Sequence, residues 1–552
     1  MDIKDYIVFL CYFVIVAGYG LYIYYKKKSA SGDSKDYFLA EGSLTWWAIG
    51  ASLIASNISA EQFIGMSGSG FKIGLAIATY EWMAAVTLIV VAVFFLPVYL
   101  KNKIFTMPQF LSVRYNSTVS MIMAVFWLLL YIVVNLTSIL FLGALAVSSI
   151  SGLDFQLCMI GLAVFAIIIT LGGMKVIGYT DVIQVFFLIL GGLATTYLAL
   201  DLVSDHFGGQ GILEGFNIVH EKASDHFHMI LQPDNANYID LPGLSVLIGG
   251  MWIINLSYWG CNQYITQRAL GADLSTARNG LLFAAVLKLL MPLIVVLPGI
   301  AAYVLYNDGK FQEEMLANGE LNPDRAYPVL LSLLPTGLKG LSFAALTAAV
   351  VASLAGKANS VATIFSLDIY QKIFDRNASE RKLVNVGKIT IVVSMILAII
   401  IAPHLGIDKK GGFQYIQEYT GFVSPGIFAM FLLGFFWKKT TSNAALFATI
   451  GGFLMSIVLK FLPKFIDLSF LASTGFSVPI NGIYEIPFID RVGFVFIFCL
   501  IGMYIISIID QRRGVVPNGL EVDKSMFKTS TSFAIGALLV LGITAALYTI
   551  FW

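Results

Sequence analysis

Two stretches of the chain place amide, hydroxyl and carboxylate side chains inside long apolar surroundings. The first, residues 52–70, reads "SLIASNISAEQFIGMSGSG" and contains Asn57, Glu61 and Gln62. The second, residues 251–267, reads "MWIINLSYWGCNQYITQ". Amides both donate and accept hydrogen bonds, so such clusters can bind a polar solute. Main-chain carbonyls that are released from a helix can also coordinate a hard cation.

The surroundings of these stretches are typical of a membrane protein. The chain is 58% hydrophobic and 12% charged, and its mean hydropathy is +0.83. Windows of about 20 apolar residues, enough to cross a bilayer, recur along the chain. They predict an all-α membrane protein with about 14 transmembrane helices, near 5–25, 46–71, 75–100, 119–149, 157–174, 178–204, 243–266, 279–306, 338–370, 385–402, 415–435, 443–461, 490–510 and 532–551.

The distribution of charge predicts the topology. We expect the first segment to remain as a helix rather than to be cleaved as a signal peptide, because Lys26, Lys27 and Lys28 follow it instead of a small-residue cleavage site. Those lysines favour the cytoplasm, so an even number of helices places both termini outside. The chain is therefore expected in the plasma membrane. A net charge of +1, distributed among short loops, indicates no nucleic-acid partner.

Several classes of membrane protein are disfavoured by the motifs that the sequence lacks. It has no phosphate-binding GxxxxGK[ST] motif, no potassium-channel filter and no repeated arginines of a voltage sensor. Acidic residues and histidines do not gather near one interface, as they usually do in a membrane enzyme. What remains is polarity at membrane depth on separate helices, which predicts a secondary transporter.

The polar stretches are interpreted as breaks in transmembrane helices. A helix in lipid must satisfy its backbone internally, so a broken helix must line a cavity enclosed by protein. Close helix packing would also use the glycines, but it does not account for the adjacent Glu61 and Gln62. The second break follows five helices later, which predicts two inverted repeats of five helices whose unwound segments enclose one small substrate. The predicted organisation is an extra helix and loop (1–45), a first repeat with an external loop (46–242), a second repeat (243–461) and additional helices (462–552).

A series of motifs, in order along nearly the whole chain, resembles a known family. The sequence is similar to the solute:sodium symporter family, and within it to bacterial sodium/galactose and sodium/glucose cotransporters. The resemblance implies a LeuT-type fold. The motifs that carry it are "ASLIASNISAEQFIGMSGSG", "TYEWMAA", "NLTSILFLG", "TDVIQVFF", "NLSYWGCNQYITQR", "FAAVLKLL", "NSVATIFSLDIY" and "FQYIQEYTGFVSPG".

The resemblance implies a binding site for a sugar and gates that cover it. A pyranose hydroxyl both donates and accepts, so acceptor-only Glu81, donor-only Lys288 and several amides suit it. An intramembrane ion pair between Glu81 and Lys288 is an alternative role that is compatible with sugar binding. The implied sugar ligands are Asn57, Gln62, Glu81, Asn255, Lys288 and Gln417. The implied gate residues are Tyr258 on the inner side and Met66, Tyr80 and Phe413 on the outer side.

The resemblance also implies a sodium site, at which this chain departs from its relatives. The implied ligands are the carbonyls of Ala55, Ile58 and Ala349 and the hydroxyl of Ser353. Ala352 replaces a serine of the relatives, and Lys357 replaces an apolar residue. Lys357 shares a helix face with Ser353, so its ammonium either reaches the cation site or extends toward the cytoplasmic interface.

The chain departs from its relatives at two further positions and matches them at one residue of the ion path. Ala84 stands where the sugar site of the relatives has a serine, and Ser257 stands where they carry a tyrosine beside the gate. Asp181 matches a carboxylate on the sodium exit path of the family. The residues alone instead favour a helix N-cap at Thr180 or Asp181, given the apolar run that follows.

The function predicted from the sequence is import of a hexose, galactose or glucose, coupled to sodium through alternating access. One alternative is a sugar carrier that is independent of sodium, either a uniporter or a proton-coupled carrier. A membrane sugar sensor is an alternative of another class, for which the chain offers no segment long enough to form a signalling domain. An enzyme is not expected.

Overall fold

The computed structural model describes residues 2–26, 44–317, 319–404 and 412–552. In this part of the chain, eleven helices are long and apolar enough to cross a membrane, and a bent pair would make a twelfth. The expected count of about 14 also included the shorter helix α10 (Phe155–Thr170) and the broken segment near 46–71. Lys27 and Lys28, which entered the topology prediction, lie outside the described residues.

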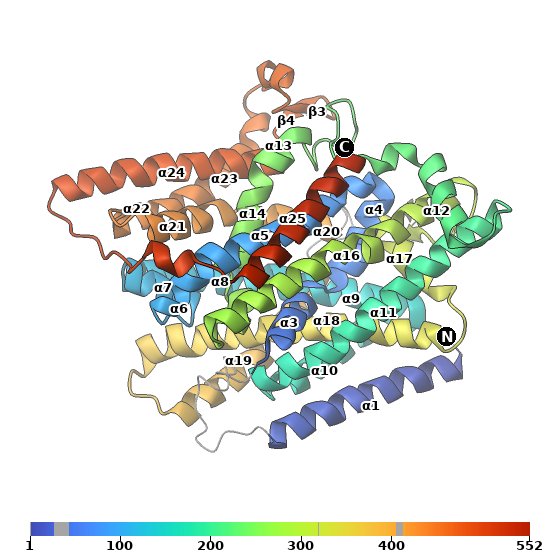
Figure 1. Ribbon diagram of the computed structural model, residues 1–552, viewed down its shortest axis with the longest axis horizontal. Helices are drawn as coiled ribbons and strands as arrows, with labels where there is room; N and C mark the ends of the chain where they lie inside the picture. Colours follow the sequence, from blue (N-terminus) through green and yellow to red (C-terminus); the bar gives the residue numbers. More distant parts are fainter. Residues whose placement is uncertain (1, 27–43, 318, 405–411) are drawn as a thin grey trace. The chain divides into compact units, whose positions relative to one another are not determined.

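The chain forms two compact units, whose helices and strands are labelled in Figure 1. Unit 1 comprises residues 1–78, 128–228 and 286–416, and unit 2 comprises residues 79–127, 229–285 and 417–552. Both units draw segments from both predicted repeats, so the boundaries of the repeats stay a prediction. Three helices cross from one unit into the other along the chain, α8 (Ser117–Leu129), α16 (Leu274–Asn307) and α20 (Gly412–Gly421).

Unit 1 is built around the helix α18 (Leu338–Thr363), whose small residues in "AALTAAVVASLAG" allow neighbouring helices to approach closely. It packs against α1, α3, α9, α10 and α11. The elements of unit 1 are α1 (Ile3–Lys26), α3 (Trp46–Asn57), η1 (Glu61–Met66), α4 (Ser67–Ile73), η2 (Leu75–Ala78), η4 (Leu130–Leu136), α9 (Thr137–Ser151), α10 (Phe155–Thr170), α11 (Met174–His206), α12 (Gly211–Lys222), η5 (Ser224–Phe227), β1 (Leu316–Ala317), β2 (Glu320–Leu321), η6 (Pro323–Arg325), α17 (Ala326–Ser332), α18, η7 (Ile364–Phe374), α19 (Glu380–Ile401) and η8 (Ala402–His404).

Unit 2 is built around α14 (Gly250–Cys261), which packs against α5, α21 and α24. One short hairpin, β3 with β4, joins its helices. The elements of unit 2 are α5 (Thr79–Val90), η3 (Val91–Phe95), α6 (Leu96–Lys101), α7 (Met107–Arg114), α13 (Gly243–Ile248), α14, α15 (Gln263–Leu270), α21 (Ser424–Phe436), α22 (Ser442–Leu446), η10 (Phe447–Gly451), α23 (Gly452–Phe461), η11 (Leu462–Lys464), η12 (Ser469–Thr474), β3 (Val478–Ile480), β4 (Ile483–Glu485), α24 (Phe488–Arg512), η13 (Lys524–Phe527) and α25 (Thr531–Ile550).

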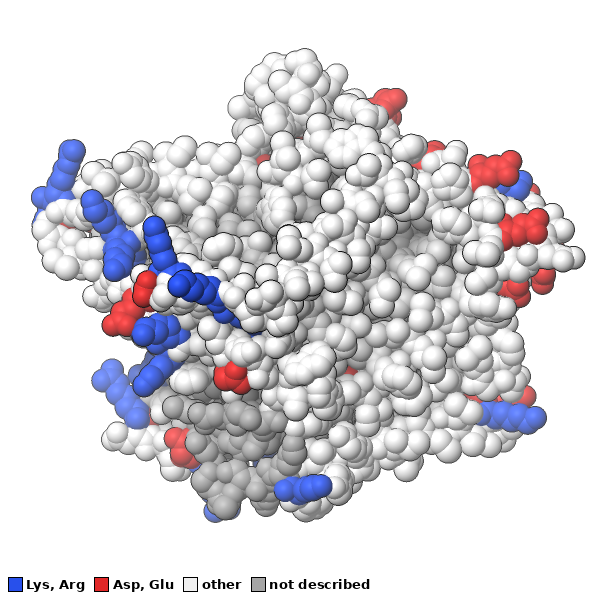
Figure 2. All heavy atoms as spheres, viewed as in Figure 1, with Lys and Arg blue, Asp and Glu red and all other residues white. Residues whose placement is uncertain are grey.

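The outer surface has the character of a lipid-facing one. On the face shown in Figure 2, lysine, arginine, aspartate and glutamate side chains gather near helix ends, and the expanse along the helices is uncharged. Large apolar side chains are exposed on the surface of the described residues, for example those of Leu538 and Leu539 on α25 (Thr531–Ile550). Such exposure is costly in water and favourable in a bilayer.

Both predicted breaks are present. In unit 1, α3 ends at Asn57, and the backbone of Ile58 is extended with φ −79° and ψ 104° before helical structure resumes at η1. In unit 2, α14 ends at Cys261, and the backbone of Asn262 is extended with φ −105° and ψ 124° before α15 begins. The polar and glycine-containing stretches of the sequence therefore locate the interruptions of both helices.

Candidate functional site

A reciprocal cap restarts the helix after the break in unit 1. The backbone N–H of Ser59 donates to Gln62 Oε1 (3.3 Å), and the backbone N–H of Glu61 donates to Ser59 Oγ (3.2 Å). This is a capping box, in which side chains satisfy the backbone donors of a first helical turn. The spacing of Ser59 and Gln62 was a readable signal that our sequence analysis missed. The amide oxygen of Gln62 is thus engaged in the cap, while its amide nitrogen carries two donors that suit a ligand.

A buried ammonium meets the end of α3. Lys288 on α16 donates a hydrogen bond from Nζ to Oδ1 of Asn57. Lys288 is 1% exposed and Asn57 is 6% exposed. A buried cation needs such polar partners, because its transfer out of water is costly. The structure therefore brings together two residues that the resemblance assigns to a sugar site.

The six sugar residues implied by the resemblance are divided between the two units. Asn57, Gln62 and Lys288 belong to unit 1, whereas Glu81, Asn255 and Gln417 belong to unit 2. Glu81 is buried on α5, and Asn255 on α14 donates to the carbonyl of Met251 (3.2 Å) in the preceding turn. Their common role in sugar binding, and the alternative ion pair of Glu81 with Lys288, stay predictions.

The gate residues are also found in both units. In unit 2, the hydroxyls of Tyr258 and Tyr264 form a hydrogen bond between side chains that flank the break at Asn262. Tyr80 is buried at the start of α5.

In unit 1, Met66 and Phe413 are both buried. Gly65 permits the close approach of Phe413, because a Cβ at Gly65 would lie 2.8 Å from the backbone nitrogen of Phe413. These contacts are compatible with gating, which stays a prediction for all four residues.

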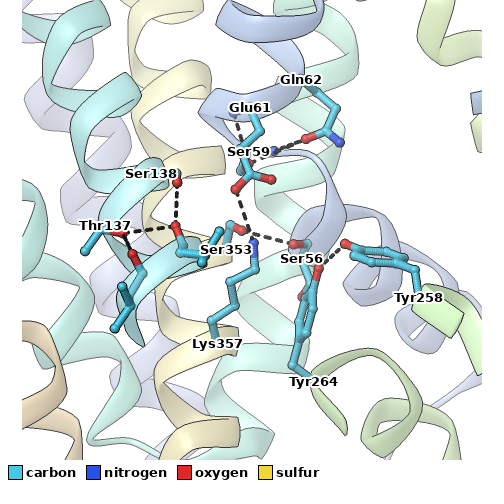
Figure 3. Close-up of polar contacts among 12 residues, drawn as sticks. Ser56, Ser59, Glu61, Gln62, Thr137, Ser138, Tyr258, Tyr264, Ser353 and Lys357 are labelled. Carbon is cyan, nitrogen blue, oxygen red and sulfur yellow. Dashed lines mark hydrogen bonds and ion pairs between the residues drawn. The ribbon is translucent and has the colours of Figure 1, made fainter. Parts of the chain in front are cut away.

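The residues of the predicted cation site lie on α3, at the break after it and on α18, and α3 packs against α18. Ser353 Oγ donates to the carbonyl of Ser56 (3.0 Å), one residue after Ala55 (Figure 3). Ala349 lies one turn before Ser353 on α18, and Ile58 is the extended residue of the break. A hydroxyl and the terminal carbonyls of a helix are oxygen ligands of the kind a hard cation prefers. Ala352 contributes no hydroxyl to this set.

Lys357 extends to the same break from the neighbouring helix. Its Nζ lies 3.7 Å from Oε1 of Glu61, and Figure 3 shows the two side chains facing each other. Lys357 is 2% exposed and Glu61 is 8% exposed. The alternative in which Lys357 extends toward the cytoplasmic interface is therefore wrong, because a buried carboxylate supplies its counter-charge inside the unit.

The N-cap role considered for Thr180 or Asp181 is also wrong. Helix α11 begins at Met174, after Gly173 with φ +79°, so both residues lie well inside the helix. Thr180 Oγ1 instead donates to the carbonyl of Val176 (2.8 Å). Asp181 is 1% exposed and accepts a 2.5 Å hydrogen bond from Ser52 Oγ on α3. The apolar run suggested a later start because glycine, rather than a capping side chain, begins this helix.

Comparison with known proteins relates this arrangement to membrane transporters. The family model described as "Sodium:solute symporter family" matches residues 37–452. The chain is 47% identical to a protein of Vibrio parahaemolyticus named "Sodium/glucose cotransporter", over 99% of this chain and 98% of that protein. It is 34% identical to the human "Sodium/myo-inositol cotransporter 2", over 82% of this chain and 69% of that protein.

Solved structures show the same fold at lower identity. The substrate-bound outward-open state of a Na+-coupled sialic acid symporter matches with a TM-score of 0.76 and 21% identity, over 92% of this chain and 98% of that one. The nucleobase-cation symporter Mhp1 matches with a TM-score of 0.50 and 14% identity, over 92% of this chain and 99% of that one. These likenesses establish the LeuT-type fold. Since the family model covers most of a chain with many apolar spans, the protein is a multi-pass membrane transporter rather than an enzyme, and it belongs to the sodium:solute symporter family.

Proposed function

We propose that this protein imports a hexose, galactose or glucose, and uses a sodium gradient to drive the import through alternating access. The observation that carries the proposal is the buried hydrogen bond between Lys288 and Asn57 at the end of a broken helix. A ligand with several hydroxyls suits such a pair, because a hydroxyl can accept from the ammonium and donate to the amide oxygen. The 47% identity to a protein named sodium/glucose cotransporter supports the choice of sugar and ion.

The roles that we propose follow the chemistry of each side chain. Asn57, Gln62 and Lys288 bind sugar hydroxyls from unit 1, and Glu81, Asn255 and Gln417 bind them from unit 2. Tyr258 covers the sugar on the inner side, and Met66, Tyr80 and Phe413 cover it on the outer side. The sodium ligands are the carbonyls of Ala55, Ile58 and Ala349 and the hydroxyl of Ser353, with Asp181 on the exit path.

Counterflow in proteoliposomes tests the proposal. Labelled galactose and labelled glucose are supplied separately to vesicles preloaded with the same sugar, in sodium and in potassium buffers. We expect sodium-dependent exchange of at least one hexose. Exchange of neither sugar would contradict the proposed substrate, and equal exchange in both buffers would contradict the coupling.

Substitutions test the sugar residues in the same assay. Gln62→Ala, Glu81→Ala and Lys288→Ala should each weaken sugar binding, because a buried group left unpaired costs about 1–3 kcal/mol, or about 5- to 150-fold in affinity. Glu320→Gln, at an exposed position of β2, is the matched control. Near-normal exchange by all three variants would place the sugar site elsewhere.

A second candidate function is sugar transport without sodium, either uniport or proton-coupled. The ion pair of Lys357 with Glu61 favours it, because it brings a fixed positive charge to the break where a free cation would bind. Ala352 supports it as well, since it removes one oxygen ligand. In this alternative, the ammonium of Lys357 takes the place of the coupling ion.

Uptake measured against sodium concentration separates the two candidates. The native protein is compared with the double variant Lys357→Met, Ala352→Ser, which removes the charge and restores a hydroxyl. Under the first candidate, both proteins require sodium. Under the second candidate, only the double variant responds to sodium. Uptake by the native protein that depends on sodium as steeply as uptake by the double variant would rule out the second candidate.

We further propose that the protein lies in the plasma membrane with both termini outside. The lysine at the end of α1, Lys26, supports this orientation through the preference of basic residues for the cytoplasm. Impermeant labelling of a cysteine added after Trp552 in intact cells tests it. Labelling only after permeabilisation would reverse the proposed orientation.

A further inference from the structure

Asp324 is a buried carboxylate in a turn that lies outside the transmembrane spans. It belongs to the short 3-10 helix η6, between α16 and α17, and it is 3% exposed. Its backbone N–H donates to Asn322 Oδ1 (3.0 Å), which fixes the turn. A carboxylate buried in a connecting turn requires an explanation, because aspartate is almost never fully buried without a partner.

The carboxylate joins two segments that are distant in the sequence. Asp324 Oδ2 accepts a 2.8 Å hydrogen bond from the backbone N–H of Gly412, the first residue of α20. Its other oxygen, Oδ1, lies against Gly68 on α4, where a Cβ would collide with it and would also lie 2.9 Å from the backbone nitrogen of Asp324. Gly68 is therefore required for the contact.

The beginning of α20 also touches η1, the helical segment that directly precedes α4. Gly65 on η1 leaves room for the backbone of Phe413, the residue after Gly412. The beginning of α20 thus lies against η1, which continues into α4 after the break at Ile58. Asp324 stabilises this contact through the hydrogen bond from Gly412 and the close approach to Gly68; we call this arrangement the fastened state.

The surroundings make the carboxylate sensitive to proton concentration. Burial raises the pKa of Asp324 from its ordinary 3.8 to about 7, and the hydrogen bond from Gly412 and the charge of Lys72 on α4 oppose this rise. Of the other elements packed against η6, α17 contributes the uncharged Tyr327, and η1 contributes Glu61, which is paired with Lys357.

We propose that Asp324 is a positioning residue that holds the first turn of α20 beside α4, and that loss of its proton favours release of this turn, because the desolvation of the ionised carboxylate outweighs its stronger hydrogen bond with Gly412. The proposal rests on the proposed function only in its consequence, because α20 carries Phe413 and Gln417, the gate and sugar residues proposed above. Release of the first turn of α20 would then accompany movement of the gate. The contact itself is independent of any sugar or ion.

The direction of the pH dependence follows from linkage. The fastened state binds the proton with a pKa of about 7, whereas a solvated Asp324 in a released state has the ordinary value of 3.8. Acid therefore favours the fastened state. As pH rises from about 4 toward about 7, the ratio of the released to the fastened population increases by up to about tenfold per pH unit. Above about pH 7 this ratio becomes constant.

The test measures access to the beginning of α20 without transport. Gln414 is buried and its amide atoms have no hydrogen-bond partner among the described residues, so Gln414→Cys removes no hydrogen bond. This cysteine is introduced into the full chain after replacement of Cys11, Cys158, Cys261 and Cys499. Its labelling by a hydrophilic maleimide is followed in detergent, without sugar, at several pH values.

Asp324→Asn is the central variant, because it keeps the shape and an acceptor oxygen but does not titrate. We expect the ratio of labelling rates, native Asp324 over Asp324→Asn, to rise several-fold between about pH 5.5 and about pH 7 and then to level off. Taking the ratio removes the pH dependence of the thiol itself. Asp324→Ala should be labelled faster than Asp324→Asn at every pH, because it loses the acceptor for Gly412. Glu320→Gln, in the same loop, should leave the native pH profile unchanged.

A ratio that does not change with pH would overturn the proposal, as would equal labelling of Asp324→Ala and Asp324→Asn. If Asp324→Ala fails to fold, the pH profile of the Asp324→Asn ratio decides alone. A purely structural role would lower stability without this profile. Failure here leaves the proposed sugar transport standing, and failure of sugar counterflow leaves the labelling result standing, so the two outcomes can be distinguished.

Discussion

Each unit contains a glutamate that is largely shielded from solvent, and the two are neutralised differently. In unit 2, Glu418 Oε1 lies 2.5 Å from Lys460 Nζ and 2.7 Å from Arg491 Nη2. In unit 1, Glu61 Oε1 lies 3.7 Å from Lys357 Nζ, which is beyond hydrogen-bond distance. The carboxylate of Glu418 is therefore neutralised by two cations within hydrogen-bond distance, as expected of a structural ion pair. Glu61 retains capacity for another donor or cation, which suits a residue at a site that changes its occupant.

The two helix breaks also differ in the side-chain hydrogen bonds that follow them. After the break in unit 1, the helix is restarted by the side chains of Ser59 and Gln62. After the break in unit 2, Asn262 occupies the N-cap position without a hydrogen bond from its side chain to the first turn. The first break is thus followed by a reciprocal side-chain cap, whereas the second is flanked by the hydrogen bond between the hydroxyls of Tyr258 and Tyr264. The following experiments sharpen this difference.

The largest effect is expected from Lys357→Met, which leaves the carboxylate of Glu61 buried without its cation. Removing one partner of a buried pair costs about 3–5 kcal/mol, so the apparent free energy of unfolding in detergent should fall by this order. The double variant Glu61→Gln, Lys357→Met should regain most of the loss, because no uncompensated charge remains. A double variant as unstable as the single one would show that Lys357 acts through packing rather than charge.

A smaller effect is expected at the break in unit 2. Tyr258→Phe removes the hydroxyl contact to Tyr264, at a cost of about 0.5–1.5 kcal/mol, but keeps the aromatic ring. Tyr258→Ala removes the ring as well, so it should impair sugar accumulation more than Tyr258→Phe does. Uptake into proteoliposomes measures both. If the two variants are equally defective, the hydroxyl rather than the ring is the working group.

Local signals in the sequence predicted a large part of this molecule. Apolar windows located the spans. Glycine beside polar residues located both breaks, because a bilayer tolerates an interrupted helix only where protein encloses the interruption. The start of α11 was misplaced because Gly173 carries no side-chain cap to read. Residues 59–62 held a capping box that was readable and was missed.

Contacts between distant segments were harder to predict. The four-residue spacing correctly placed Lys357 on the face of Ser353, but Glu61 as its counter-charge depends on the packing of α18 against α3. Asp324 carries no local signal at all, since Gly68 and Gly412 become its neighbours only in the folded chain. The sequence pattern of an element indicates its own periodicity. It does not indicate which distant turn will pack against that element in the folded chain.

The side-chain cap at the first break provides a third test, with an effect of about 1 kcal/mol. Ser59→Ala removes the acceptor for Glu61 N–H and should lower the free energy of unfolding by about 0.5–2 kcal/mol. The double variant Ser59→Ala, Gln62→Ala should lose less than the sum of the single losses, because the two side chains act as one cap. If the double variant loses the full sum of the two single losses, Ser59 and Gln62 do not act as one cap.

The smallest effect is expected from Lys460→Met in unit 2. Glu418 keeps Arg491 at 2.7 Å, so the substitution does not leave its carboxylate without a cation. The side chain of Lys460 is 25% exposed, whereas that of Lys357 is 2% exposed. Ion pairs that reach solvent contribute about 0–1 kcal/mol, so Lys460→Met should lower the apparent free energy of unfolding in detergent several times less than Lys357→Met does. Because both substitutions exchange lysine for methionine beside a buried glutamate, a loss as large as that of Lys357→Met would mean that Arg491 does not compensate, and that Glu418 is no better neutralised than Glu61.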